Sequence, residues 1–117
     1  MSYVDGFVLP VPKKNLAAYR RMAQKGAKIW REHGALQYVE AVGDDLATPC
    51  GLPFPRTVKP KAGEVIVFSW ILYKSRAHRD RVNAKAMKDP RMQMFGKAMP
   101  FDVKRMNHGG FKVLVEA

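Results

Sequence analysis

Four short stretches of the chain carry the side-chain pattern of β-strands. They are rich in aromatic and β-branched residues or alternate apolar with polar positions, and both patterns favour extended backbone. The predicted strands cover residues 3–9, 35–42, 64–73 and 111–116. Proline cannot donate to a strand ladder, so we expect Pro10 and Pro12 to close the first strand. Residues 107–110 are typical of a turn before the last strand.

Two longer stretches have the helical period. Over residues 13–33, apolar side chains recur every three or four positions and fall on one face of a helix, which the following glycine is expected to end. Ser75 is a good N-cap for a second helix over residues 76–88. Pro90 should stop that helix, because the residue before a proline avoids the helical conformation. Residues 91–99 are predicted to form a further short helix.

The order of these elements is strand, helix, strand, strand, helix, strand. With right-handed crossovers, it predicts an α+β, ferredoxin-like βαββαβ fold, in which a four-stranded antiparallel sheet carries both helices on one face. The whole chain, residues 1–117, is expected to form a single domain. Residues 44–63 form a proline-rich connection, and its length is typical of a functional or mobile loop.

The predicted strand 64–73 is apolar on both of its faces. The helices cover only one face of the sheet, so the other face would expose a large apolar surface. A homodimer in which two sheets close face to face, as a dimeric α/β barrel, would bury that surface. Because ligand sites are concave and mostly apolar, the interior of such a barrel is also where a small ligand is expected.

A specific combination of short motifs extends over nearly the whole chain. The motifs are residues 3–12, 30–35, 38–40, 42–45, 68–70, 73–80, 100–102, 104–106 and 109–111. This combination resembles the YbaA-like family of uncharacterised bacterial proteins. The resemblance implies a dimeric α/β barrel, in agreement with the burial argument. It implies no catalytic residues, because the family has no established activity.

The chain is strongly basic, with 21 Lys and Arg against 10 Asp and Glu and a net charge of +11. Most of the excess falls in the predicted helices, where it is either a solvated surface or a site for an anionic partner. The βαββαβ order is also that of RNA-recognition modules, whose third strand carries a glycine and a basic residue. Residues 65–73 have neither. Binding of nucleic acid or another anion through the helices is therefore the alternative function, not the favoured one.

Three side chains are candidates for acid–base chemistry. Asp5 and Glu40 are acids inside otherwise apolar strands, and burial would raise their pKa, as a general acid or base often requires. His78 shares a helix face with Val82 and Ala86 and is a candidate proton acceptor. The structural alternatives are that the acids pair with an arginine across a dimer, and that His78 is a hydrogen-bonded core or capping residue.

Four side chains with a polar tip lie on or near the predicted sheet and are candidates for orienting an aromatic or quinone-like ligand: Tyr38, Ser69, Trp70 and Tyr73. Ordinary core packing is the alternative for each of them. The histidines have neither the spacing nor the cysteine partner of a zinc site, so no metal is expected. No dinucleotide or phosphate-loop motif is present, so no motif implies a cofactor.

Cys50 is the one cysteine of the chain, which is typical of a reducing compartment. The N-terminus lacks the pattern of a secretion signal, and no apolar run approaches the roughly 20 residues of a membrane span. We therefore expect a cytoplasmic protein without a membrane partner. The favoured function is binding of a small apolar or aromatic ligand by a homodimer, with proton transfer or cofactor-free oxidation as the associated chemistry. A non-catalytic structural dimer is a further alternative.

Overall fold

The computed structural model describes residues 2–95 and 99–117. Its centre is a four-stranded antiparallel sheet in the order β2-β3-β1-β4. The strands are β1 (Tyr3–Pro12), β2 (Gln37–Val42), β3 (Glu64–Tyr73) and β4 (Asn107–Lys112). The two longest strands, β1 and β3, are the central pair. The α+β, ferredoxin-like fold predicted from the sequence is confirmed.

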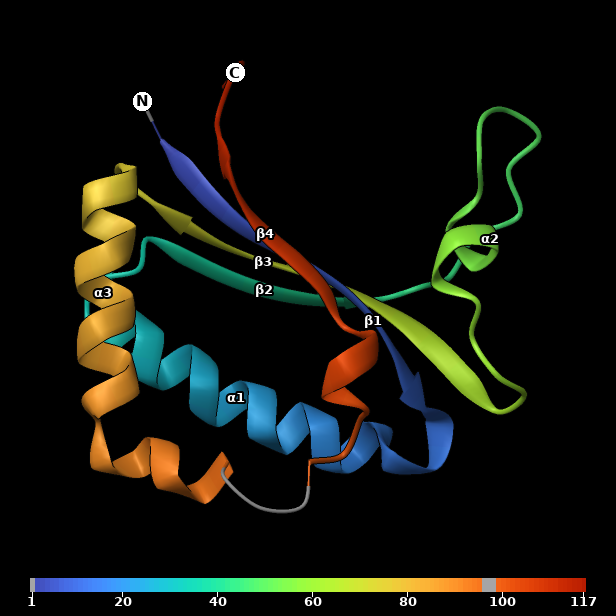
Figure 1. Ribbon diagram of the computed structural model, residues 1–117, viewed down its shortest axis with the longest axis horizontal. Coiled ribbons are helices and arrows are strands. Elements are labelled where there is room, and N and C mark those ends of the chain that lie inside the picture. Colours follow the sequence, from blue (N-terminus) through green and yellow to red (C-terminus); the bar gives the residue numbers. More distant parts are fainter. Residues whose placement is uncertain (1, 96–98) are drawn as a thin grey trace.

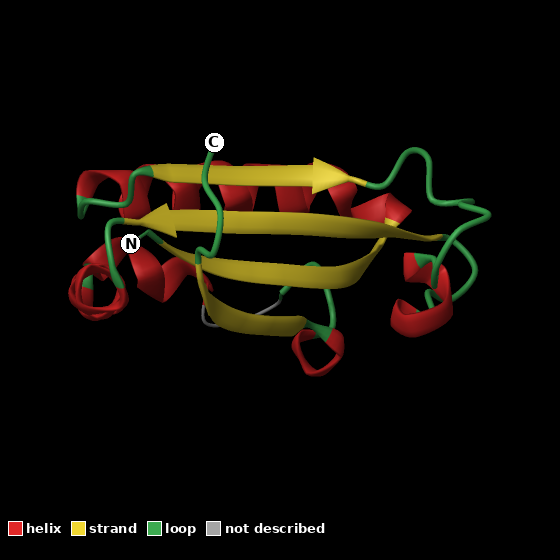
Figure 2. Cartoon of the chain, turned by 90° about the horizontal axis from the view of Figure 1, so that it is seen from above, coloured by secondary structure: helices red, strands yellow, loops and turns green. Residues whose placement is uncertain are grey.

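Both long helices lie on one side of the sheet. Helix α1 (Leu16–Glu32) runs below the sheet, and α3 (Arg76–Lys88) crosses one of its ends (Figure 1). Ser75 caps α3 as predicted, because its Oγ accepts a hydrogen bond from the backbone N–H of His78 at 3.1 Å. Figure 2 shows the opposite face of the sheet in front, with α1 behind the strands.

Within the described residues, the connections contain four short helical segments: α2 (Phe54–Val58) and the 3-10 helices Lys13–Asn15, Pro90–Phe95 and Val103–Arg105. The predicted loop 44–63 therefore includes one turn of α-helix. The short helix predicted over residues 91–99 is a 3-10 helix as far as Phe95. Residues 96–98 of that prediction lie outside the described residues.

The predicted end of the first strand is wrong, because β1 continues through both prolines to Pro12. Pairing between β1 and β4 ends at Val8. Within the described residues, the part of β1 that contains Pro10 and Pro12 therefore pairs only with β3. Proline is tolerated on such an edge, since no ladder bond is lost on the unpaired side.

The predicted turn at residues 107–110 is also wrong, because these residues begin β4. The predicted strand 111–116 starts four positions too late. The glycines that suggested a turn instead allow close packing within the sheet. Gly109 lies opposite Gly6, and a side chain at Gly110 would collide with the ring of Tyr3.

The buried core is divided into two clusters on the helix-covered side of the sheet. One cluster is centred on Tyr73 and Val82, and the other is centred on Leu9, Val67 and the α1 residue Tyr19. Phe7 packs against both clusters. The space between them is where the candidate site lies.

Candidate functional site

The alternation of side chains sorts the predicted site residues onto the two faces of the sheet. Glu40 lies opposite Ser69, and Tyr38 and Asp5 lie on either side of Ile71, all on the face that the helices cover. Tyr73 shares this face and is fully buried. These side chains therefore point toward the helices, not toward the face on which a barrel would close.

Trp70 lies on the opposite, uncovered face of the sheet. It pairs with Gly6 of β1 and Val39 of β2, and its indole Nε1 donates to Gln37 Oε1 at 3.1 Å. The structure therefore separates Trp70 from the other three predicted ligand-orienting residues, because residues of opposite parity on a strand face opposite ways.

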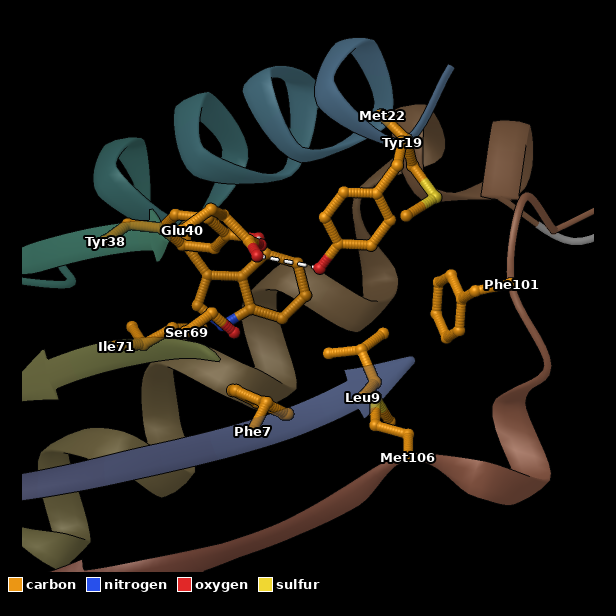
Figure 3. Close-up of a pocket in the computed structure, with 11 residues that line it drawn as sticks. Phe7, Leu9, Tyr19, Met22, Tyr38, Glu40, Ser69, Ile71, Phe101 and Met106 are labelled. Atoms are coloured by element: carbon orange, nitrogen blue, oxygen red, sulfur yellow. Dashed lines mark hydrogen bonds between the residues drawn. The ribbon is translucent and has the colours of Figure 1, made fainter. Parts of the chain in front are cut away.

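A cavity of about 210 Å³ lies between the sheet and α1 (Figure 3). Its wall is almost entirely apolar and aromatic, with a single carboxyl group, that of Glu40. The lining residues are Phe7, Leu9, Tyr19, Met22, Trp30, Tyr38, Glu40, Ser69, Ile71, Phe101 and Met106.

Two tyrosines hold the Glu40 carboxyl group at this cavity. Tyr19 of α1 donates its hydroxyl to Oε1 at 2.7 Å, and Tyr38 of β2 donates to Oε2 at 3.0 Å. Burial raises the pKa of Glu40, and the hydrogen bonds from the tyrosines partly offset that rise. Burial and the neighbouring carboxylate raise the pKa of both tyrosines, so they remain hydrogen-bond donors.

A glycine in the middle of α1 makes room for this arrangement. A Cβ atom at Gly26 would lie 3.3 Å from the Tyr38 hydroxyl, closer than an ordinary van der Waals contact. Glycine weakens a helix interior by up to about 1 kcal/mol relative to alanine. Gly26 is the sequence signal that marks this close approach. Neither Gly26 nor Tyr19 was among the predicted site residues.

The carboxylate of Asp5 belongs to a separate polar network on the same face. Its Oδ1 accepts from Arg79 Nη1 of α3 at 2.8 Å, and its Oδ2 lies 3.5 Å from Asn83 Nδ2. Asn83 Oδ1 in turn accepts from Trp30 Nε1 at 2.9 Å and from the Tyr73 hydroxyl at 3.0 Å. The arginine that pairs with Asp5 thus comes from the same chain.

His78 is not brought to either carboxylate. Its Nδ1 accepts from the backbone N–H of Lys74 at 3.0 Å, and its ring packs edge-on against Tyr73. Burial and the nearby Lys74 and Arg81 lower its pKa. The geometry is that of a residue that stabilises the turn between β3 and α3.

The raised pKa of Glu40 makes the stability of the fold depend on pH. The folded state binds this proton more tightly than the unfolded chain, so the stabilisation is complete below the unfolded pKa near 4.5 and is lost as pH rises through the folded value. We expect the stability of Glu40→Gln relative to the parent protein to increase with pH above 4.5. Urea unfolding of both proteins across this range measures the difference, and parallel stability profiles would contradict the expectation.

The remaining candidate features carry no comparable geometry. Cys50 is exposed on the connection between β2 and α2. Within residues 2–95 and 99–117, no three His, Cys, Asp or Glu side chains are grouped closely enough to hold a metal ion. None of the helices in these ranges combines the length and the apolar character that crossing a bilayer requires.

Comparison with known proteins gives consistent results for sequence and fold. A family model described as "Protein of unknown function (DUF1428)" matches residues 2–103. The chain is 47% identical over 116 residues to the uncharacterized protein YbaA of Escherichia coli K12, covering 99% of both chains, and the match to YbaA of Shigella flexneri is the same. Among solved structures, a dimeric ferredoxin-like protein from an uncultured marine organism aligns over 100% of both chains with a TM-score of 0.58 and 15% identity.

Proposed function

The chain belongs to the DUF1428 family of proteins of unknown function, and we propose that it binds a small aromatic ligand in the cavity beside Glu40. The observation that carries the proposal is an apolar cavity of about 210 Å³ with a carboxyl group at one point of its wall. An apolar cavity of roughly 150 Å³ holds benzene. The cavity beside Glu40 therefore has room for one aromatic ring with a small substituent.

The cluster around the carboxyl group favours a ring that carries a hydroxyl group. Glu40 accepts one hydrogen bond at each oxygen, from Tyr19 and from Tyr38, and a carboxylate has further lone pairs to accept a third. A phenolic hydroxyl of the ligand would donate to it. Because burial raises the pKa of Glu40, the same group is better suited than an exposed carboxylate to take up and return that proton.

Binding of phenol tests this proposal. We expect phenol to raise the melting temperature of the parent protein and to bind about tenfold more weakly to Glu40→Gln, since a hydrogen bond to a charged group contributes about 1.5 kcal/mol or more. Glu64→Gln is the matched control, because Glu64 pairs with Arg105 and does not line the cavity. Calorimetric titration of the three proteins gives the comparison. Equal phenol affinity in Glu40→Gln and the parent, or no binding to any of them, would refute the proposal.

We further propose that two copies of the chain associate through the uncovered face of the sheet. The side chains on this face are largely apolar and include Val4, Val8, Val39, Phe68, Trp70, Leu72 and Phe111. Phe68 is 43% exposed and Phe111 60% exposed in the single chain. A contiguous apolar surface of this kind marks an interface.

The C-terminal segment after β4, residues 113–117, supports the same association. Leu114 and Val115 are 87% and 83% exposed. The segment is tied to the start of β1, because Val113 N–H donates to the Ser2 carbonyl at 3.0 Å, and it extends beyond the uncovered side of the sheet (Figure 1). Two apolar side chains held there are placed to contact a second copy. The fold relative from the uncultured marine organism is described as dimeric.

A further inference from the structure

A second cavity, of about 410 Å³, adjoins the one beside Glu40. It lies between α3, the end of α1 and strands β1 and β4. Its polar wall is formed by Asp5, Arg79 and Asn83, and β4 contributes His108, Gly109 and Gly110 at one side. Asp5 was predicted as an acid–base residue, with pairing to an arginine across a dimer as the structural alternative, and neither Arg79 nor Asn83 was among the predicted site residues.

The two cavities have a common wall. Phe7, Trp30 and Ile71 line both of them. Asn83 fixes the position of Trp30, because its Oδ1 accepts the indole N–H at 2.9 Å. The polar network of the larger cavity therefore holds one of the side chains at which the two cavities meet. A ligand that extends past Trp30 would reach both.

The polar groups of the larger cavity have hydrogen-bonding capacity to spare. Arg79 uses its Nε and both terminal nitrogens on Asp80, Asp5 and Tyr3, which leaves two of its five N–H groups. One N–H of Asn83 is directed at Asp5, and the other has no bond within the described residues. The Asp5 carboxylate retains lone pairs. Donors and acceptors are thus both offered to a ligand.

The charge balance in this cavity selects between polar ligands. One guanidinium lies between two carboxylates, with Arg79 2.8 Å from Asp5 and 2.9 Å from Asp80. An anionic group would be repelled by the Asp5 carboxylate in the cavity wall, and the charge of Arg79 is already shared between Asp5 and the exposed Asp80, which does not line the cavity. A cationic group would compete with Arg79 for Asp5. A neutral group that both donates and accepts, such as a primary amide, meets neither penalty.

We propose that the two cavities form one ligand site, which takes an aromatic ring beside Glu40 and a neutral polar head group, such as a primary amide, beside Asp5 and Arg79. The inference rests on the proposed function of the ring cavity. It adds the chemical class of the rest of the ligand: an aromatic compound with a short chain that ends in an amide or a similar neutral group.

Titration with compounds that share a phenyl ring and differ in chain length and head group tests the inference. The probes are phenylacetamide, 3-phenylpropanamide and 4-phenylbutanamide, with the carboxylates and the primary amines of matched length. We expect the best amide to bind at least about tenfold more tightly than phenol and than the matched carboxylate and amine at neutral pH. Phenol binding with no gain from any amide would overturn this inference and leave the proposed function standing. Absence of binding by phenol and by every probe would overturn both.

Two charge variants test the inference through the ratio of amide affinity to carboxylate affinity. A purely structural role of Asp5 or Asp80 would leave this ratio unchanged. Asp5→Asn keeps the shape of the side chain and leaves Arg79 beside one carboxylate, so the preference for the amide over the carboxylate should shrink by about tenfold. Asp80→Asn removes the other carboxylate, at a side chain that is 61% exposed and tolerant of change, and should shift the preference in the same direction. Glu64→Gln is the control, because Glu64 pairs with Arg105 and lines neither cavity, and it should leave the ratio unchanged. An unchanged ratio in Asp80→Asn would contradict the inference, whether or not Asp5→Asn folds.

Discussion

Replacing Phe68 with glutamate is expected to convert the proposed dimer into a folded monomer. Phe68 lies on the uncovered face of the central strand β3, where it packs edge-on against Trp70 with ring centroids 5.7 Å apart. Burying a phenylalanine side chain contributes about 1.5 to 3 kcal/mol, and a twofold interface contains the residue twice. The substitution also places two carboxylates in an apolar interface. We expect the dimer dissociation constant to rise by about a thousandfold.

Sedimentation at a series of protein concentrations measures this change. Met87→Glu is the matched control, because Met87 is 65% exposed on α3, on the other side of the sheet. It should leave the dimer intact. Circular dichroism of Phe68→Glu should match that of the parent protein, since the side chain is 43% exposed in the single chain. A parent protein that sediments as a monomer at micromolar concentration would contradict the proposed association.

Replacing Arg79 with methionine is expected to destabilise the fold by about 3 kcal/mol or more. The Asp5 carboxylate is 90% buried, and Arg79 is its only ion-pair partner among the described residues. Removing one member of a buried ion pair leaves the other charge uncompensated, which typically costs about 3 to 5 kcal/mol. The substitution also removes the guanidinium from the Tyr3 ring, 4.9 Å from its centroid.

The double variant Asp5→Leu with Arg79→Met separates this cause from a loss of packing. With no charge left unpaired, it should recover most of the lost stability, because apolar residues of similar volume often replace a buried ion pair without net loss. Denaturant unfolding of the two single variants and the double variant provides the thermodynamic cycle. Equal destabilisation in Arg79→Met and in the double variant would show that the ion pair is not the cause.

The elements with a strong local pattern were predictable from the sequence. The helical period before Gly34 and the two apolar faces of β3 identify α1 and the centre of the sheet. Strand β4 was misplaced because its pattern depends on a neighbour. Its glycines resemble a turn until the sheet places Gly109 opposite Gly6 and Tyr3 against Gly110. Register of this kind is a tertiary property, which local propensity does not encode.

The candidate site was predictable in part for the same reason. Acids in apolar strands mark Asp5 and Glu40, since an isolated carboxyl group is costly to bury. Their partners are remote in sequence: Tyr19 precedes Glu40 by 21 positions, and Arg79 follows Asp5 by 74. No pattern along the chain joins such pairs. The fold brings them together by packing α1 and α3 on one face of the sheet.

A crystal of the protein soaked with 4-bromophenol tests most directly whether Glu40 and its two tyrosines form a ligand site. The bromine is located by its anomalous scattering. We predict one strong bromine peak inside the cavity lined by Leu9 and Ile71, with the phenolic oxygen within hydrogen-bond distance of the Glu40 carboxyl group. Bromine peaks confined to other parts of the molecule, with the cavity free of ligand at saturating concentration, would contradict the account.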